Sequence, residues 1–435
     1  MTWRLALACA LAAAFAAFGE PTAPRMDRGK FHIGAYCFYH EFLHDEAHVK
    51  EVKDCGVDFL IGVPADAPRS LFDSLARHGI GCVVGGALPG WWGGDGENAG
   101  KLREKQPLAM YEKALADFVA KGDHPAIWML DLCDEPSARD FAYLGELCKL
   151  VSERTPATPA YLNLYPNYAV GSENSGKQVI DQLGTRTYEE HIATYDRTVP
   201  LDYLSYDHYM YFDDSAMTRD WVKRMYDNYR VVADCCRRSG RDFWYIPQVN
   251  TRTKLKLKMT ENKLRYQAFT AMAFGAVAIN WACWSPGWWV NNVYDKDGKR
   301  DDEVYARLKR VNGEIWRVAG DFMRYRNVDT RYVWLAGGAS EYGDGTFTDL
   351  TTTDSSALLV GSMVARDGGR ARAVFVFAAG DPTDERGEAH RVTFRTYARN
   401  LRAIGNEGDV VFNHNADGTY SFALRDNACA LIMAD

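Results

Sequence analysis

The segment AIWMLDLCDEP at residues 126–136 is a continuous apolar run that ends in two carboxylates and a proline. An apolar run of strand length without polar alternation is typical of a strand that is covered on both faces. Pro136 stands in a position where helices often begin. The segment therefore predicts a buried parallel strand whose end, at Asp134 and Glu135, leads into a helix.

Seven further apolar runs of similar length flank this segment. They are FHIGAYCFY (31–39), DFLIGVPA (58–65), GCVVGGALP (81–89), AYLNLYPNY (160–168), YLSYDHYMY (203–211), FWYIPQVN (243–250) and AVAINWACWS (276–285). Amphipathic stretches of helix length lie between them, for example at 107–121, 138–154 and 218–239. Eight strands that alternate with helices over roughly 300 residues are typical of a (β/α)₈ barrel, which we predict over residues 28–327.

A doubly wound open sheet is the alternative α/β fold. It would carry a glycine-rich phosphate loop after an early strand, and GVPADAP after the second run is not one. The barrel is therefore the favoured interpretation.

The pattern changes after residue 327 to short runs of alternating polarity. The runs are VWLAGG, ALLVGSMV, ARAVFVFAAG, HRVTFRTYA, VVFNH, YSFAL and ACALIM, with turn signals such as Asp417-Gly418 between them. Short alternating strands predict a small antiparallel β-sandwich over residues 328–435. Since no low-complexity linker separates the two parts, we expect the sandwich to pack on the barrel.

The first residues read MTWRLALACALAAAFAAFGEPTAPR. Arg4 precedes an apolar run that is shorter than the roughly 20 residues needed to span a membrane. This pattern predicts a signal peptide at residues 1–19 and a secreted or periplasmic protein.

Composition excludes some classes of partner. The net charge is −7 with acidic and basic residues mixed, so we expect no nucleic-acid partner. The ten histidines form no HxH group, and we expect no metal and no other cofactor. The cysteines after the signal segment are odd in number and show no zinc-type spacing, which favours buried free thiols: Cys37, Cys55, Cys82, Cys133, Cys148, Cys235, Cys236, Cys283 and Cys429.

The active site of a barrel lies at the C-terminal ends of its strands, so the candidates are the polar and aromatic residues that end the eight runs. The candidate catalytic residues are Glu135, Asp134 and Asp207. The candidate substrate-binding residues are Tyr36, Trp91, Trp92, Asn163, Tyr165, Tyr206, His208, Tyr209, Gln248, Trp281 and Trp284.

These residue types suit glycosidic cleavage. The reaction needs a carboxylic acid that protonates the leaving oxygen and a second group at the anomeric carbon. Burial raises the pKa of a carboxyl and favours the acid role. Trp281, Trp284, Trp288 and Trp289 lie within nine residues, and flat aromatic faces stack on sugar rings. The structural alternatives are a helix cap at Asp134 and core packing of the tryptophans.

The segment HPAIWMLDLCDEP resembles the fourth-strand motif of clan A glycoside hydrolases, in which an Asn-Glu-Pro supplies the acid/base Glu. The resemblance implies that Glu135 is the acid/base. The barrel with an appended sandwich is similar to family 42 β-galactosidases. Two departures stand out: Asp134 replaces the Asn that touches the sugar 2-hydroxyl, and the seventh run offers Gln248 where the clan has its nucleophilic Glu.

The adjacent Asp134 and Glu135 are also similar to the Asp-Glu pair of family 20 and 123 hexosaminidases, where the 2-acetamido group of the substrate attacks the anomeric carbon. Asp207 in YLSYDHY is similar to the Asp of the sixth-strand Tyr-Asp of family 18 chitinases, whose long acidic fourth-strand motif this chain lacks. Three interpretations stay open: a glycoside hydrolase with Asp207 as the second carboxylate, an N-acetylhexosaminidase that uses Asp134, and a non-catalytic glycan-binding barrel. We favour the first, with a carbohydrate as the partner.

Overall fold

The computed structural model describes residues 25–36, 41–93, 98–172, 181–211, 215–250, 259–287, 292–334, 342–352, 357–381, 387 and 389–434. The signal peptide expected at 1–19 lies outside the described residues, as do Cys37, Trp288 and Trp289.

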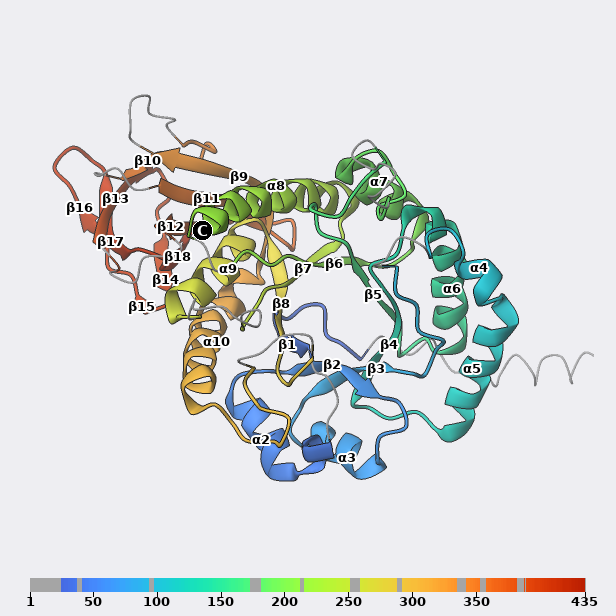
Figure 1. The fold of residues 1–435 in the computed structure, drawn as a ribbon. Helices are drawn as coiled ribbons and strands as arrows, with labels where there is room; N and C mark the ends of the chain where they lie inside the picture. Colours follow the sequence, from blue (N-terminus) through green and yellow to red (C-terminus); the bar gives the residue numbers. More distant parts are fainter. Residues whose placement is uncertain are drawn as a thin grey trace, which may run out of the picture.

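Eight parallel strands form a closed barrel in chain order (Figure 1). They are β1 (His32–Tyr36), β2 (Phe59–Pro64), β3 (Gly81–Gly85), β4 (Ile127–Asp134), β5 (Ala160–Leu164), β6 (Tyr203–Asp207), β7 (Asp242–Ile246) and β8 (Ala276–Ala282). The barrel closes between β8 and β1, where Gly34 pairs with Asn280. Each predicted apolar run overlaps one of these strands, so the (β/α)₈ prediction is confirmed.

Helices surround the strands as an outer ring (Figure 1). They are α2 (Glu46–Asp54), α3 (Arg69–Arg77), α4 (Leu102–Lys105), α5 (Leu108–Lys121), α6 (Phe141–Arg154), α7 (Tyr188–Thr198), α8 (Ser215–Ser239), α9 (Glu261–Ala273) and α10 (Asp302–Phe322), with 3₁₀ turns η1 (Glu41–His44) and η2 (Ala138–Asp140). Helix α10 shows the usual amphipathic pattern, because Leu308, Val311 and Ile315 are buried on one face.

Aromatic side chains fill the barrel at the starts of its strands. The rings of Tyr203 and Trp244 stack at 4.2 Å, and those of Phe59 and Trp128 at 6.2 Å. A Cβ at Gly81 would lie 1.9 Å from the Trp128 ring, so only glycine fits there. Since this layer occupies the lumen at one end, a site within the barrel forms at the C-terminal ends of the strands.

Two antiparallel sheets follow the barrel, as the sequence predicts. The six-stranded sheet has the order β15-β14-β18-β12-β11-β9, and the four-stranded sheet β10-β13-β17-β16. Their strands are β9 (Tyr325–Trp334), β10 (Phe347–Thr352), β11 (Ala357–Ala365), β12 (Arg372–Ala379), β13 (Ala389–Thr396), β14 (Leu401–Gly405), β15 (Gly408–Asp409), β16 (Asn413–His414), β17 (Tyr420–Arg425) and β18 (Cys429–Ala434).

The central strands of the six-stranded sheet, β11, β12 and β18, are buried on both faces. On β12, Val374 and Val376 belong to the core between the two sheets, whereas Phe375 and Phe377 belong to the barrel core. This alternation follows from the two-residue period of a strand. Phe377 lies 5.6 Å from the ring of Tyr266 on α9, a helix that is buried along almost its whole length.

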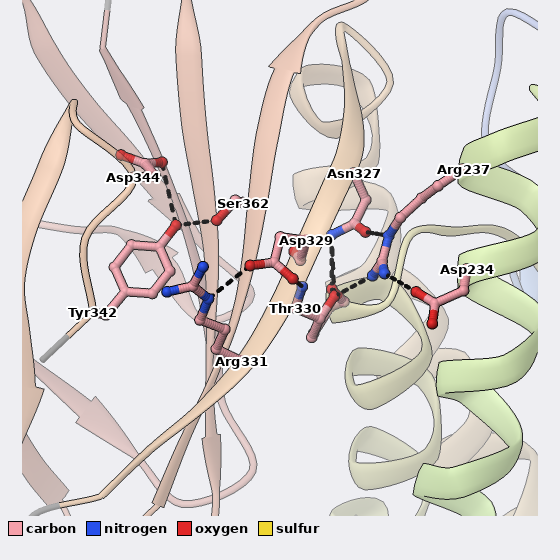
Figure 2. A network of polar contacts seen from close by, with 10 residues as sticks. Asp234, Arg237, Asn327, Asp329, Thr330, Arg331, Tyr342, Asp344 and Ser362 are labelled. Atoms are coloured by element: carbon pink, nitrogen blue, oxygen red, sulfur yellow. Dashed lines mark hydrogen bonds and ion pairs between the residues drawn. The ribbon is translucent and has the colours of Figure 1, made fainter. Parts of the chain in front are cut away.

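Polar contacts also join the two parts (Figure 2). Arg237 on α8 pairs with Asp234 at 2.7 Å and donates to Asn327 and Thr330 on β9, each at 2.8 Å. Asn327 and Thr330 donate in turn to the carbonyl of Ala273 at the end of α9. The first strand of the sandwich therefore satisfies a helix carbonyl of the barrel.

Candidate active site

A β-bulge near the end of β4 turns two aspartates to the same face. Asp131 pairs with Tyr161 and Asp134 with Asn163, with a register shift between Asp131 and Cys133. Because Tyr161 and Asn163 are two residues apart on β5, they share a face, and so do their partners. Asp131 and Asp134 therefore both face the inside of the barrel. Bulges commonly aim side chains next to active sites.

Glu135 leaves the strand by a backbone conformation that is rare for its residue type. Its φ is +49°, in the left-handed region, and its backbone N–H donates to the carbonyl of Asn163 at 2.9 Å. The turn breaks the alternation of side chains, so that Glu135 and Asp134 serve one site although they are sequence neighbours. Such strained residues cluster at functional sites.

Gly93 permits this arrangement. Its N–H donates to the carbonyl of Asp134 at 3.1 Å, and a Cβ at this position would lie 2.1 Å from the carbonyl oxygen of Glu135. The segment after β3 can therefore approach Glu135 only because residue 93 is glycine.

Trp92, next to Gly93, lies against the acid. Its Nε1 donates to Oε2 of Glu135 at 3.1 Å, and 55% of the residue is exposed. Trp91 is buried instead, with the Lys105 ammonium 5.6 Å from its ring centre. Of the two candidate tryptophans after β3, the structure brings only Trp92 to the site.

Asp207 ends β6 and approaches the carboxylates of β4 through Asn163. The Nδ2 of Asn163 donates to Oδ1 of Asp207 at 2.9 Å and to Oδ1 of Asp134 at 3.2 Å. The hydroxyl of Tyr209 also hydrogen-bonds Asp207.

The carboxyls of this group hold their protons to unusually high pH. Burial and then the neighbouring Asp134 raise the pKa of Asp131 and that of Asp207 to about 7. Burial raises the pKa of Asp134 to about 6, against hydrogen bonds from Asn163 and the backbone of Glu135. Burial, then Asp207 and then Asp134 raise the pKa of Glu135 well above its usual value, against the hydrogen bond from Trp92. Glu135 therefore holds its proton to a higher pH than an ordinary glutamate does.

Four tyrosines surround these carboxyls: Tyr36, Tyr161, Tyr168 and Tyr209. The pKa of each is raised well above its usual value, first by burial and also by the nearby carboxylates. Their hydroxyls therefore stay neutral and provide hydrogen-bond donors around the acids.

The prediction that Trp281 and Trp284 form a platform for a sugar ring is wrong. Trp281 and Trp284 are fully buried. The indole N–H of Trp281 donates to Asn312 on α10 at 2.8 Å, and that of Trp284 donates to His48 on α2 at 3.1 Å. The ring of Trp281 faces the helices, because its neighbour Asn280 is the residue of β8 that faces the inside, where its Oδ1 would crowd a Cβ at Gly34. Trp284 lies beyond the end of β8.

Four other candidates are also buried away from the carboxyls. The ring of Tyr206 stacks on Phe243 outside the barrel, and the hydroxyl of Tyr165 donates to the carbonyl of Gly93. Gln248 accepts from the backbone of Met210 and Tyr211 and so braces a loop. His208 is fully buried with its ring 5.1 Å from that of Tyr168.

Sequence reasoning missed three residues of the site: Asp131, Tyr161 and Tyr168. Tyr168 ends the fifth apolar run and could have been found by the rule that selected the others. Asp131 lies in the fourth run, but its orientation toward the site depends on the bulge in β4.

Three further observations hold for the described residues: the state of the cysteines, the absence of a metal-binding group and the absence of a membrane-spanning helix. The eight cysteines among them are free and buried, as expected. Within these ranges, no group of three or more His, Cys, Asp or Glu side chains is arranged to hold a metal ion. No described helix is long and apolar enough to cross a membrane.

No protein-family model and no curated protein matches the sequence. Among solved structures, a putative alpha-galactosidase from Bacteroides fragilis is 8% identical over 94% of this chain and 79% of its own, with a TM-score of 0.48. A beta-galactosidase from Bacillus circulans sp. alkalophilus is 9% identical over 94% and 99%, with a TM-score of 0.46.

A beta-glucuronidase from Bifidobacterium dentium is 12% identical over 65% of this chain, with a TM-score of 0.43, and this chain spans 46% of its length. A family 2 glycosyl hydrolase from Bacteroides cellulosilyticus is matched over 58% of its length. Because all these identities are low, the activity of this chain is inferred from its own residues.

Proposed function

We propose that this chain is a glycoside hydrolase that cleaves O-glycosidic bonds, with Glu135 as the general acid and Asp207 as the second carboxylate. One observation carries the proposal. At the mouth of the barrel, Glu135 is partly buried beside two further carboxyls and under the exposed indole of Trp92.

The environment of Glu135 suits an acid. A general acid must hold its proton at the working pH and release it in the transition state. Burial and the charges of Asp207 and Asp134 keep the proton on Glu135, while the Trp92 N–H stabilises the carboxylate that forms when the proton leaves. The exposed ring of Trp92 offers a flat apolar face beside this acid.

Two features favour Asp207 as the second carboxylate: its charge acts on Glu135, and its ionised form is stabilised by hydrogen bonds. The charge of Asp207 raises the pKa of Glu135 more than that of Asp134 does, although Asp134 is the sequence neighbour. Asp207 also receives hydrogen bonds from Asn163 and Tyr209, which stabilise its ionised form. An ionised Asp207 serves as nucleophile or as base for a water, and the stereochemistry of the product tells these two apart.

A second candidate activity is substrate-assisted cleavage of 2-acetamido sugars. One observation supports it: Asp134 faces the inside of the barrel next to Glu135 and accepts a hydrogen bond from Asn163. In that mechanism Asp134 orients the 2-acetamido group, and Asp207 is not required for attack.

The test is a screen of aryl glycosides of hydroxyl sugars and of 2-acetamido sugars, together with polysaccharides and product analysis. Glu135→Gln should lower turnover of unactivated substrates at least about 10²-fold. Glu153→Gln, on the exposed face of α6, is the matched control and should leave turnover unchanged. A glycan-binding barrel without catalysis would instead bind oligosaccharides, and no substrate would be turned over by the wild type.

The sequence of residues 1–19 also leads us to propose that the chain is exported. Cell fractionation of the full chain and of a chain lacking these residues tests this, since only the full chain should leave the cytoplasm.

A further inference from the structure

Asn163 stands at the centre of the carboxyl group described above. It lies on β5, where it pairs with Asp134 of β4 on one side and with Ser205 of β6 on the other. Its side chain is almost fully buried, with 3% of the residue exposed. A side chain in this place contacts both strands that supply the carboxylates.

The hydrogen bonds of Asn163 use both ends of its amide. Nδ2 has two protons and donates to Oδ1 of Asp134 and to Oδ1 of Asp207. Oδ1 accepts from the hydroxyl of Ser205 at 3.0 Å. Because the Ser205 proton is used in this bond, the hydroxyl of Tyr161, 3.3 Å away, is the donor to Ser205.

This chain of donors determines which way the amide faces. Every donor from Tyr161 through Ser205 to Asn163 points toward the two carboxylates, and hydrogen bonds in such a chain strengthen one another. The opposite orientation would place the amide oxygen against two carboxylate oxygens. The amide is therefore held as a donor to both acids.

We propose that Asn163 is a positioning residue whose amide, oriented by Ser205, holds Asp134 and Asp207 in one arrangement that keeps Asp207 available as the basic partner of Glu135. The expected effect on kcat rests on the proposed function. The expected effect on the pKa values of Asp134 and Asp207 rests on hydrogen bonding alone. Each donated hydrogen bond stabilises the ionised form of its acceptor, and Asn163 does so for both acids.

The test replaces Asn163 by Asp, which has nearly the same shape but lacks both N–H donors and, when protonated, can donate to only one of the two acids. Asn163→Asp should lower kcat roughly 10- to 100-fold, because charge-assisted hydrogen bonds to the carboxylates are lost. The acidic limb of the pH profile should also move to higher pH. Ser205→Ala should shift the limb in the same direction but less, since the amide keeps its donors and loses only its anchor.

Asn312→Asp is the matched control. Asn312 is also a buried asparagine that uses both ends of its amide, but it joins Trp281 to the carbonyl of Cys55. This variant should lower the melting temperature and leave the acidic limb in place. A purely structural role for Asn163 would give the same result as this control and would overturn the proposal.

A second measurement does not need turnover. Infrared titration of the carboxyl bands, comparing wild type with Asn163→Ala, should show protonation of the buried aspartates beginning at higher pH in the variant. An unchanged titration overturns the inference. If the wild type cleaves no glycoside, the proposed function fails, while the titration still decides the role of Asn163.

Discussion

The indole N–H of Trp92 donates a hydrogen bond of 3.1 Å to the carboxyl of Glu135. The two residues come from different strand ends, and Gly93 allows the approach. Trp92 is the link between the buried acid and the solvent-exposed mouth of the barrel, because more than half of its surface is exposed. One side chain therefore both influences the acid and offers a ring to the substrate.

Trp92→Phe separates these two roles. Phe keeps a ring but removes the donor that lowers the pKa of Glu135, so the basic limb of the pH profile should move to higher pH. Trp92→Ala should also weaken substrate binding by about 5- to 10-fold, the equivalent of about 1–1.5 kcal/mol of aromatic contact.

The control is Trp316→Phe on α10, which removes an indole that is also part-exposed and donates to the carbonyl of Gly56. Its pH profile should match that of the wild type. A basic limb that stays in place in Trp92→Phe would contradict the role of the hydrogen bond.

Asp207→Ala should lower the turnover of glycosides whose sugar carries a 2-hydroxyl at least about 10²-fold, because no second carboxylate then acts at the anomeric carbon. Azide should restore part of the activity, with a product stereochemistry that reports the mechanism. Asp220→Ala on the exposed face of α8 is the control.

The opposite pattern would favour Asp134. Full activity of Asp207→Ala, cleavage of 2-acetamido sugars only, and strong inhibition by a thiazoline mimic of the cyclised intermediate would together refute the assignment of Asp207.

Asp131→Asn should change how stability depends on pH. Burial raises the pKa of Asp131 from 3.8 to about 7, so between these values the folded chain keeps a proton that the unfolded chain releases. The free energy of unfolding then falls as pH rises, by up to about 1.4 kcal/mol per pH unit from this group. The variant should lose this slope.

Urea unfolding at several pH values from 4 to 7 measures the effect. Asp66→Asn, an exposed position, should give a curve parallel to that of the wild type. Parallel curves for Asp131→Asn as well would show that Asp131 does not hold the proton.

Trp281→Phe should destabilise the fold without affecting substrate. The indole is fully buried and donates to Asn312, so losing the bond and part of the ring should cost about 1–3 kcal/mol in urea unfolding. KM should be unchanged. A raised KM with unaltered stability would restore Trp281 to the substrate site.

The sequence predicts the fold well because the barrel depends on patterns that repeat. Each barrel strand is a short apolar run, and the sandwich strand β13 alternates, with Val392 and Phe394 buried between polar residues. These periods are visible without knowledge of contacts. The sequence also predicts that Asp134 and Glu135 lie at the end of the fourth strand and Asp207 at the end of the sixth.

Side-chain direction could not be predicted to the same degree. The bulge in β4 places Asp131 and Asp134 on one face, and the left-handed Glu135 joins them, so simple alternation fails there. The side chains of β8 alternate between the two faces, but the pairing with β1 decides whether its even-numbered or its odd-numbered residues face the inside of the barrel. Trp281 was assigned to the wrong face for this reason.

Strand β12 is buried on both of its faces, and this affects the thermal unfolding of the protein. Phe375 and Phe377 complete the core that the barrel helices begin, so neither part retains its apolar contacts once the other unfolds. A chain cut before β9 would expose the apolar side of α9 and aggregate. We expect a single calorimetric transition for the whole chain, so that the barrel and the sandwich behave as one cooperative unit despite their separate topologies.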